Sequence, residues 1–332
     1  MRAIVMTQHG GPEVLEAREL PEPTAAPGEV LVRVRAFGLN HADTYMRSGA
    51  WSFGIPVLGI ECVGIVEEDP SGRLQPGATV VALVGGLARD RNGSYAELVA
   101  VPSTNVVAVQ TDLSWADLAA IPEVYATAWT ALHGNLALEE GQTVLVRGGT
   151  SAVGQAAVNL AVDTGATVIA STRTPDHAEH LRALGAGEVL IDDGHLAPQI
   201  RARRPSGIDA ALDLVGNSVL RDTLQCVAPR GRVCQIGFLG GLDPVEDFNP
   251  LADLPSGVAL STFASAFVLG GEGFPIADVP IQTIVEKAER GVFAARPSRV
   301  FAFEEIVEAH RVMESGEAGG KVVVTFSGPA AS

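Results

Sequence analysis

The chain has 332 residues, enough for two domains of about 100 to 200 residues each. Hydrophobic residues make up 47% and charged residues 19%, which is typical of a folded globular protein. The formal charge of −16 argues against nucleic acid and anionic membranes as partners, because both attract basic surfaces. The sequence begins without a signal-peptide pattern and holds no apolar run of about 18 residues, so we expect a cytoplasmic protein.

Residues 1–121 consist of short β-like runs, such as RAIVM and EVLVRVRAFG, separated by glycine and proline clusters. This pattern predicts a compact, mostly β domain with tight turns. From residue 122 onward, short apolar strands alternate with helix-length amphipathic stretches, which is typical of βαβ units around a buried parallel sheet. We therefore predict an α/β protein with a Rossmann-type domain over residues 122–270.

Residues 271–332 hold two expected helices, VPIQTIVEKAERG and FEEIVEAHRVMESGE, and a last strand, KVVVTF. These are too few elements for a third domain, so we expect them to complete the first one. Just before them, the run GVALSTFASAFVLGG is apolar and β-prone. We expect an edge strand there that joins two copies in a homodimer.

A strand, a glycine-rich turn, a helix and a second strand follow each other in TVLVRGGTSAVGQAAVNLAVDTGATVIASTR. This order predicts a dinucleotide-binding turn, with Gly149 making the turn and Gly154 allowing the helix to pack on the strand. Ser151 stands where a second glycine is usual and brings a hydroxyl to the helix N-terminus. The expected cofactor contacts in this turn are Gly149, Thr150, Ser151, Ala152, Val153 and Gly154.

The second strand of this unit ends in Ser171, Thr172 and Arg173, and the nearest carboxylate is Asp176, beyond Pro175. NAD enzymes place an acidic residue here for the ribose hydroxyls, whereas a 2′-phosphate requires a cation and hydroxyl groups. The strand end therefore predicts NADPH as the cofactor. The alternative is that Arg173 is an ordinary solvated surface charge.

Ten ordered segments make the chain similar to a known superfamily over nearly its whole length. They are GGPEVL, PGEVLVRVRAFGLNHADTYMRSG, IPVLGIECVGIVE, QPGATVVAL, GSYAELVAVP, AAIPEVYATAWTAL, GGTSAVG, ALDLVG, GRVCQIG and GGKVVV. The chain resembles the medium-chain dehydrogenase/reductase superfamily, and within it the zinc-free quinone oxidoreductase group that includes zeta-crystallin. The resemblance implies a GroES-like β-rich catalytic domain over 1–121 and 271–332, and a Rossmann NADP(H)-binding domain over 122–270.

Zinc alcohol dehydrogenases of this superfamily hold a catalytic metal at positions that the resemblance assigns to Asn40, Ile60 and Glu123. An aliphatic side chain cannot bind zinc, and VVALVGGLARDRNGSYAE replaces the cysteine-rich loop of a structural zinc site. The resemblance therefore implies a metal-independent reduction of an activated double bond. Carboxylates at Asp43, Glu61 and Glu123 could gather nearby, and structural hydrogen bonding is favoured over a cation site.

The resemblance also assigns residues to the reaction. Asn40 would donate a hydrogen bond to the substrate carbonyl or to the nicotinamide amide, or only cap a turn. Tyr45 would supply a proton to the enolate, or only line the pocket. Further cofactor contacts are expected at Thr127, Val215, Gly216, Gly237, Phe238 and Lys321, although Lys321 could instead be a strand-edge charge. The phenylalanines Phe53, Phe238, Phe263 and Phe267 would form an aromatic pocket, or belong to the cores.

Three functions remain open at this stage. The favoured one is an NADPH-dependent reductase of a small quinone or enone. The second is an enoyl-thioester reductase of secondary metabolism, and the third is an NADPH-binding protein without turnover, as in lens crystallins of this group.

Overall fold

The computed structural model describes residues 1–51 and 55–326. Its residue contacts divide the chain into two compact units: unit 1 comprises residues 1–126 and 266–332, and unit 2 comprises residues 127–265. The limits between the units fall inside helices α3 (Pro122–Trp129) and α9 (Ser265–Val268). The domain limits 121/122 and 270/271 stay predictions from the sequence.

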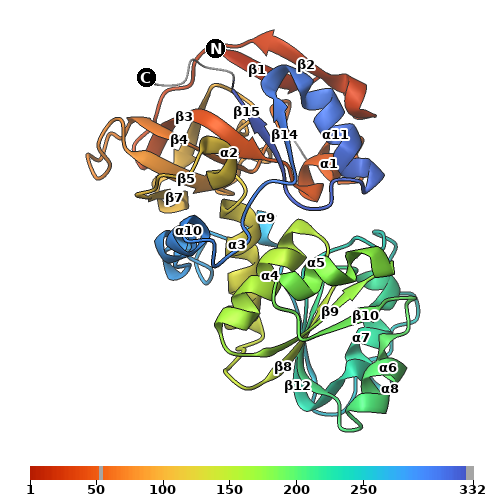
Figure 1. The fold of residues 1–332 in the computed structure, drawn as a ribbon. Coiled ribbons are helices and arrows are strands. Elements are labelled where there is room, and N and C mark those ends of the chain that lie inside the picture. Colours follow the sequence, from red (N-terminus) through yellow and green to blue (C-terminus); the bar gives the residue numbers. More distant parts are fainter. Residues whose placement is uncertain (52–54, 327–332) are drawn as a thin grey trace. The chain divides into compact units, whose positions relative to one another are not determined.

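Unit 1 is built on a seven-stranded sheet with the order β14-β15-β3-β4-β5-β7, in which β6 also pairs with β3 (Figure 1). All of its pairs are antiparallel except β14 with β15. A separate antiparallel pair is formed by β1 and β2. The strands of unit 1 are β1 (Arg2–Met6), β2 (Leu15–Glu19), β3 (Glu29–Gly38), β4 (Glu61–Glu68), β5 (Thr79–Leu83), β6 (Leu98–Pro102), β7 (Val106–Ala108), β14 (Arg299–Ala302) and β15 (Val322–Thr325).

The last strand of unit 1 comes from the C-terminal segment of the chain. Strand β15 pairs with β3 and places Val323 opposite Gly38, so segments far apart in sequence share one sheet (Figure 1). The apolar faces of these strands form one core, which includes Val32, Phe37 and Val324. The helices of unit 1 are α1 (His41–Ser48), α2 (Trp115–Leu118), α10 (Ile281–Glu289) and α11 (Ile306–Ser315), of which the last two were expected from the sequence.

Unit 2 is a six-stranded sheet with the order β10-β9-β8-β11-β12-β13, and every neighbouring pair is parallel. Its strands are β8 (Thr143–Arg147), β9 (Thr167–Thr172), β10 (Glu188–Ile191), β11 (Ile208–Asp213), β12 (Val227–Gln235) and β13 (Ala259–Thr262). Its helices are α4 (Ala152–Asp163), α5 (Ala178–Ala183), α6 (Leu196–Arg203), α7 (Leu220–Cys226) and α8 (Pro250–Asp253). The α/β class, with a mostly β part and a Rossmann-type part, is confirmed.

The apolar run 257–271 is only partly a strand. Its first part forms β13, which lies at the edge of the parallel sheet as expected. Its second part forms the short helix α9, and the expectation of a continuous strand was wrong there. Ala266 within α9 agrees with this difference, because alanine favours helix and is depleted in strands. The pairing of two copies through this edge stays a prediction.

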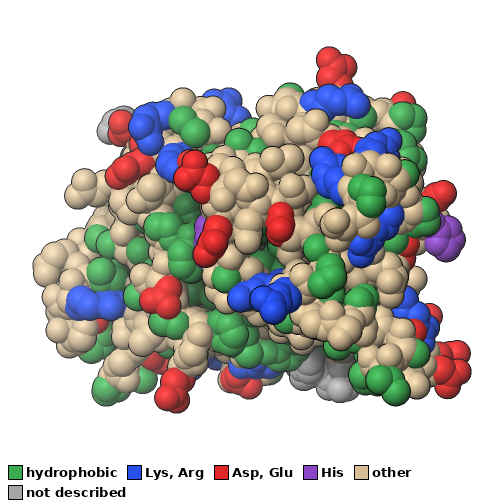
Figure 2. Space-filling view, turned by 90° about the horizontal axis from the view of Figure 1, so that it is seen from below, with side chains coloured by type: hydrophobic (Ala, Val, Ile, Leu, Met, Phe, Trp, Pro, Cys, Tyr) green, Lys and Arg blue, Asp and Glu red, His purple; other side chains and the backbone are tan. Residues whose placement is uncertain are grey.

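The surface is mixed in charge. On the face shown in Figure 2, Lys and Arg side chains lie among Asp and Glu side chains. Within residues 1–51 and 55–326, no helix is long and apolar enough to cross a lipid bilayer.

Candidate active site

The carboxyl edge of the parallel sheet in unit 2 carries the candidate dinucleotide site. Numbered along the chain within unit 2, the strands lie in the order 3-2-1-4-5-6, which reverses between β8 and β11. Ligands of such sheets bind beyond the carboxyl ends of the strands, at the point of reversal. The turn of residues 148–151 follows β8 directly and leads into α4, so the glycine-rich segment lies at that point.

The turn requires glycine for its backbone and for its packing. Gly148 has a left-handed backbone with a φ of +86°, which glycine adopts without strain. A Cβ on Gly154 would lie 2.8 Å from the Cα of Gly149, so the start of α4 leaves no room for a side chain. The packing role of Gly154 agrees with the sequence. The left-handed turn position belongs to Gly148 and not, as expected, to Gly149, which instead lies against Ala170.

Ser151 uses its hydroxyl inside the turn. The Oγ accepts a hydrogen bond from the Gly154 N–H at 3.1 Å and donates to the Gly148 carbonyl at 2.9 Å. Ser151 is thus the N-cap of α4. The N–H groups of Ala152 and Val153 open the helix, and such groups lack a carbonyl partner within the helix. The main chain of the first turn, more than the serine hydroxyl, is suited to hold a phosphate.

Two buried hydroxyl side chains and then an exposed cation follow one another at the end of β9. Ser171 Oγ accepts a hydrogen bond from the Gly148 N–H at 3.1 Å and donates to Asp192 at 3.3 Å. Thr172 Oγ1 donates to the Thr174 carbonyl at 3.0 Å. Arg173 is exposed and pairs with no carboxylate among the described residues. Of the three residues expected at a 2′-phosphate, Arg173 is the one whose polar group is not engaged within the fold.

Arg147, the last residue of β8, holds this edge together and was not identified from the sequence. Its fully buried guanidinium donates two hydrogen bonds of 2.8 Å to Asp192, one of 2.8 Å to Asp222 and one of 2.9 Å to Thr223. Burial alone would raise the pKa of Asp192, but the guanidinium lowers it below its ordinary value. Because Asp192 also accepts from Ser171, the arginine positions the glycine turn indirectly. A charged residue ending the apolar run TVLV was the available signal.

The loops after β11 and β12 approach each other closely. Asp213 Oδ1 accepts hydrogen bonds from the N–H groups of Val215 and Gly216, at 2.9 and 2.8 Å. Gly216 has a φ of +88°, and a Cβ on it would overlap the Gly237 carbonyl. The residues expected from the strand ends are therefore brought together. They line the same carboxyl edge as the glycine turn.

Three further residues of unit 2 were expected near the cofactor or acceptor. Thr127 is buried in helix α3, and Phe238 is half-buried just beyond β12. Phe263 is 2% exposed and belongs to the core of the unit, so it is not part of an open aromatic pocket.

In unit 1, Asn40, Glu61 and Lys321 form a buried polar cluster. The Asn40 amide donates to Glu61 Oε1 at 2.9 Å and accepts a hydrogen bond from the Lys321 ammonium at 2.7 Å. The ammonium also donates to Glu61 Oε1 at 2.5 Å. Asn40 is 8% exposed and Lys321 5% exposed. Lys321 is therefore not a strand-edge charge, and its pairing with Glu61 was not foreseen.

Two more acidic residues are linked to this cluster by hydrogen bonds from main-chain N–H groups. Glu61 Oε2 accepts a hydrogen bond from the Glu123 N–H at 2.9 Å. Asp43 accepts from the Asn40 N–H at 2.9 Å and from the Gly59 N–H at 3.1 Å, which fixes the start of α1. Burial raises the pKa of Asp43 to about 7, against the opposing effect of the Asn40 hydrogen bond. The contacts of Asp43 and Glu61 agree with the structural hydrogen bonding that the sequence favoured.

A row of aromatic rings begins at Tyr45 of α1. Tyr45 lies with its ring centre 5.3 Å from that of Trp51, which lies 5.4 Å from that of Phe267. The guanidinium of Arg89 stacks over Phe267 at 5.5 Å. Burial raises the pKa of Tyr45, so the phenol keeps its proton near neutral pH. Phe53, which was expected to join this row, lies outside the described residues.

Comparison with known proteins identifies the family. Residues 26–111 match the alcohol dehydrogenase GroES-like domain, and residues 184–324 match the zinc-binding dehydrogenase family. A quinone oxidoreductase of Pseudomonas aeruginosa is 30% identical over 97% of this chain and 99% of its own length. The chain is a medium-chain dehydrogenase/reductase of the quinone oxidoreductase-like group. It is therefore an oxidoreductase of that superfamily.

Other relatives of this medium-chain dehydrogenase/reductase are much longer. The lovastatin diketide synthase of Aspergillus terreus is 31% identical over 92% of this chain, which spans only 12% of the synthase. Among solved structures, mycobacterial Rv1454c complexed with NADPH shares 27% identity and a TM-score of 0.84, over 98% of this chain and 99% of that one. The superfamily membership and the nucleotide-binding fold are thus supported by sequence and by structure.

Members of the superfamily include zinc enzymes, whose ligand positions correspond to Asn40, Ile60 and Glu123 in this chain. Asn40 offers an amide that already bonds to a cation and an anion, and Ile60 offers no ligand atom. The main-chain N–H of Glu123 donates a hydrogen bond to Glu61. A Lys321 ammonium in the cluster would repel a metal ion. In the described residues no group of three or more His, Cys, Asp and Glu side chains is arranged to hold one. The residues do not fit zinc.

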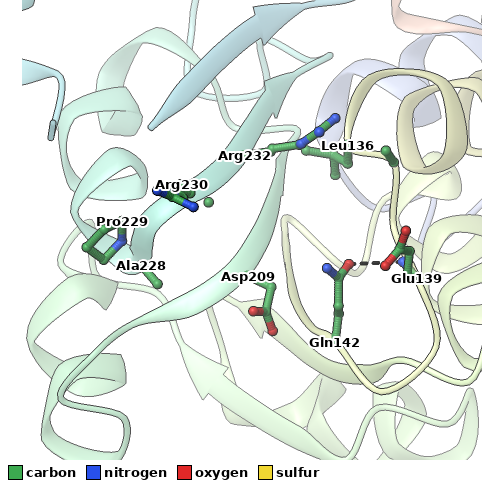
Figure 3. A pocket seen from close by; sticks show the side chains of 10 residues that line it. Leu136, Glu139, Gln142, Asp209, Ala228, Pro229, Arg230 and Arg232 are labelled. Carbon is green, nitrogen blue, oxygen red and sulfur yellow. Dashed lines mark hydrogen bonds between the residues drawn. The ribbon is translucent and has the colours of Figure 1, made fainter. Parts of the chain in front are cut away.

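A cavity of about 330 Å³ in unit 2 lies away from the dinucleotide turn. It is lined by residues at the amino ends of the parallel strands, including Asp209 and Arg230 (Figure 3). Beside it, Gln142 accepts a hydrogen bond from the Glu139 N–H at 2.9 Å (Figure 3). Since Rossmann folds bind dinucleotides at the carboxyl ends, this cavity is not the cofactor site.

Proposed function

We propose that the protein is an NADPH-dependent, zinc-independent reductase that transfers hydride to a quinone or an α,β-unsaturated carbonyl compound. The observation that carries the proposal is the side-chain set of unit 1, in which an amide and an aliphatic side chain stand at two of the three zinc-ligand positions and the Lys321 ammonium bonds to that amide. Oxidation of an alcohol by zinc enzymes relies on the metal as a Lewis acid. An activated double bond needs hydrogen-bond donors instead.

The preference for NADPH is supported by Arg173. It is an exposed cation directly after β9 and two residues beyond Ser171, whose hydroxyl accepts a hydrogen bond from the Gly148 N–H. A guanidinium binds a phosphate with two parallel hydrogen bonds, and no carboxylate of the described residues is paired with it.

The bound dinucleotide would supply the hydride. The residues that would hold it are those of the carboxyl edge, namely Gly148, Gly149, Thr150, Ser151, Ala152, Val153, Gly154, Ser171, Thr172, Arg173, Val215, Gly216, Gly237 and Phe238, with Thr127 of α3. Tyr45 is a neutral phenol able to donate a hydrogen bond to the acceptor. Asn40 would orient its neighbours.

A second candidate is favoured by the match to part of a diketide synthase. In that case the acceptor would be an enoyl thioester. The chemistry at the double bond would be the same, and the difference would lie in the part of the acceptor that binds away from it.

The purified full-length protein should be assayed with NADPH and NADH against a benzoquinone, a short-chain enone and a crotonyl thioester. We expect kcat/KM to be at least about tenfold higher with NADPH, because a lost phosphate–arginine pair is worth about 1.4 kcal/mol or more. Incubation with EDTA should leave the rate unchanged. A preference for NADH, or a rate abolished by EDTA and restored by zinc, would refute the proposal. A higher kcat/KM for the thioester than for both other acceptors would support the second candidate.

A further inference from the structure

We propose that the Lys321 ammonium is the electrophile of the reaction, donating a hydrogen bond to the acceptor oxygen as negative charge develops on it. This inference rests on the proposed function and changes the roles within it. The sequence assigned the hydrogen bond to Asn40 and placed Lys321 among the cofactor contacts. The contacts in unit 1 reverse these two roles.

Both the nitrogen and the oxygen of the Asn40 amide are hydrogen-bonded within the fold. Its Nδ2 donates to Glu61 Oε1 at 2.9 Å and to the Gly38 carbonyl at 3.4 Å, and its Oδ1 accepts from Lys321 at 2.7 Å. The ammonium on one side and the carboxylate on the other fix which way the amide points. Asn40 is therefore a positioning residue, since donation to a substrate would require it to leave a charged partner.

One of the three N–H groups of the Lys321 ammonium is available to a further acceptor. An ammonium carries three N–H groups, and two of them are engaged by Asn40 and Glu61. Among the described residues no third acceptor bonds to Nζ. A buried charge gains from a further acceptor, so the third N–H is the group of this cluster that is suited to an incoming oxygen.

Gly38 keeps the lysine in place. The Cε of Lys321 and the Oε1 of Glu61 both lie directly over the Cα of Gly38, and a Cβ there would overlap with them. Gly38 ends β3, two residues before Asn40, and pairs with Val323 of β15. The two strands thus hold the ammonium beside the amide through the backbone, which preorganises the donor.

The bound dinucleotide would supply a hydride, with its electron pair, to the β-carbon of the acceptor. The electron pair of the carbon–carbon double bond would then form a double bond between the α-carbon and the carbonyl carbon, and the electron pair of the carbonyl double bond would move to the oxygen, giving an enolate. The Lys321 N–H donates a hydrogen bond to that oxygen, and the ammonium keeps its proton. The α-carbon then takes a proton from water, which yields the saturated carbonyl compound and the oxidised dinucleotide. Glu61 balances the charge of the Lys321 ammonium when no acceptor is present.

A neutral pair of substitutions tests the role of the ammonium. Lys321→Met alone would leave the Glu61 carboxylate buried without a cation, so the main variant is Lys321→Met with Glu61→Gln. The chain has only one other lysine, Lys287 of α10, and Lys287→Met is the matched control. Each protein is assayed with an enone and with a quinone, and NADPH affinity is measured by fluorescence titration.

We expect the double variant to bind NADPH within about threefold of the wild type and to reduce the enone about 10²- to 10³-fold more slowly, the usual loss for one oxyanion donor. Quinone reduction should fall less, because the product anion is an aromatic phenolate that needs less stabilisation. A merely structural lysine would not separate the two acceptors. Lys287→Met should keep both rates.

An enone rate within about fivefold of wild type in the double variant would overturn the proposal, as would a weakened NADPH affinity that accounts for the whole loss. If the double variant does not fold, Gly38→Ala, which displaces Lys321 while keeping both charges, should show the same order of losses. Equal losses for both acceptors in that variant would also overturn it. Failure of the proposed function itself is distinct, because the wild type would then reduce no acceptor.

Discussion

Arg147 and Asp192 are joined by two hydrogen bonds of 2.8 Å at the carboxyl edge of the parallel sheet, although 45 residues separate them. The same guanidinium reaches Asp222, whose carboxylate accepts the N–H groups of Leu196 and Ala197 at the start of α6. One side chain therefore links the ends of two strands with two helices. The cofactor turn rests on this link through Ser171.

Replacing Arg147 should strongly destabilise the protein. Arg147→Leu leaves the Asp192 and Asp222 carboxylates, whose side chains are only 8% and 15% exposed, without their cation, and breaking such a pair costs about 3 to 5 kcal/mol. The free energy of unfolding, measured by urea titration, should fall by this amount. Arg203 is the matched control, because its side chain is 52% exposed where it pairs with Glu188, and Arg203→Ala should cost less than about 1 kcal/mol. A similar loss in both variants would show that the buried network adds nothing of its own.

Adding one methyl group at Gly154 should weaken dinucleotide binding. The new Cβ would press on the Gly148 carbonyl and on Gly149, which moves the turn away from the start of α4. We expect the NADPH Kd, measured by fluorescence, to rise at least about tenfold, because phosphate binding depends on close approach of this backbone. Gly134→Ala is the control, since its Cβ would meet only Thr130 at 3.7 Å. An unchanged Kd in Gly154→Ala would exclude this turn as the phosphate site.

Arg173 should decide between the two dinucleotides. Arg173→Ala removes the exposed cation of β9, so kcat/KM with NADPH should fall about tenfold or more while kcat/KM with NADH changes little. Arg182→Ala removes an equally exposed arginine from α5 and should keep the ratio. If both variants shift the ratio alike, the effect comes from overall charge, and the assignment of Arg173 to the 2′-phosphate is wrong.

His310 should make the protein less stable in acid. Burial, together with the Arg47 charge, lowers the pKa of His310 to about 3. Between this value and its ordinary pKa the unfolded chain binds a proton that the folded protein does not, so stability rises with pH over this interval. It should level off above the ordinary pKa of the unfolded histidine, at about 6.5.

The measurement is the difference in unfolding free energy between wild type and His310→Leu at several pH values. This difference should grow by about 1.4 kcal/mol for each pH unit between roughly pH 4 and 6 and then stay constant. His177, which is exposed, gives the comparison variant, His177→Leu, which should leave the slope unchanged. A flat difference for His310→Leu would mean that the folded protein protonates this histidine without penalty.

Local patterns in the sequence predicted the elements that depend on neighbouring residues. The alternation of strand, turn and helix around Gly148 became β8, α4 and β9, and the amphipathic stretches after residue 280 became α10 and α11. These elements form because apolar periodicity and glycine positions act within a few residues of one another. The run 257–271 shows the limit of the method, since both strand and helix fit a short apolar segment.

The polar clusters could not be predicted in the same way. Lys321 and Asn40 are 281 residues apart, and their contact depends on the register between β15 and β3. A single sequence does not carry that register, so a lysine before an apolar strand fits an exposed edge as well as a buried site. Ser171 illustrates a second limit. Its residue type suggested a phosphate contact, and the sequence alone did not show that its hydroxyl also bonds to the Gly148 N–H and to Asp192.

The pairing of Lys321 with Glu61 also bears on the order in which the protein is completed during synthesis. These partners are 260 residues apart, so the lysine follows the glutamate by roughly 13 to 50 s at about 5 to 20 residues per second. Unit 2 lies wholly between them and is continuous in sequence, so it can fold while unit 1 still lacks β14 and β15. Throughout that interval the Glu61 side chain lacks its partner, the Lys321 ammonium. A nascent chain should therefore acquire dinucleotide binding well before it can reduce an acceptor.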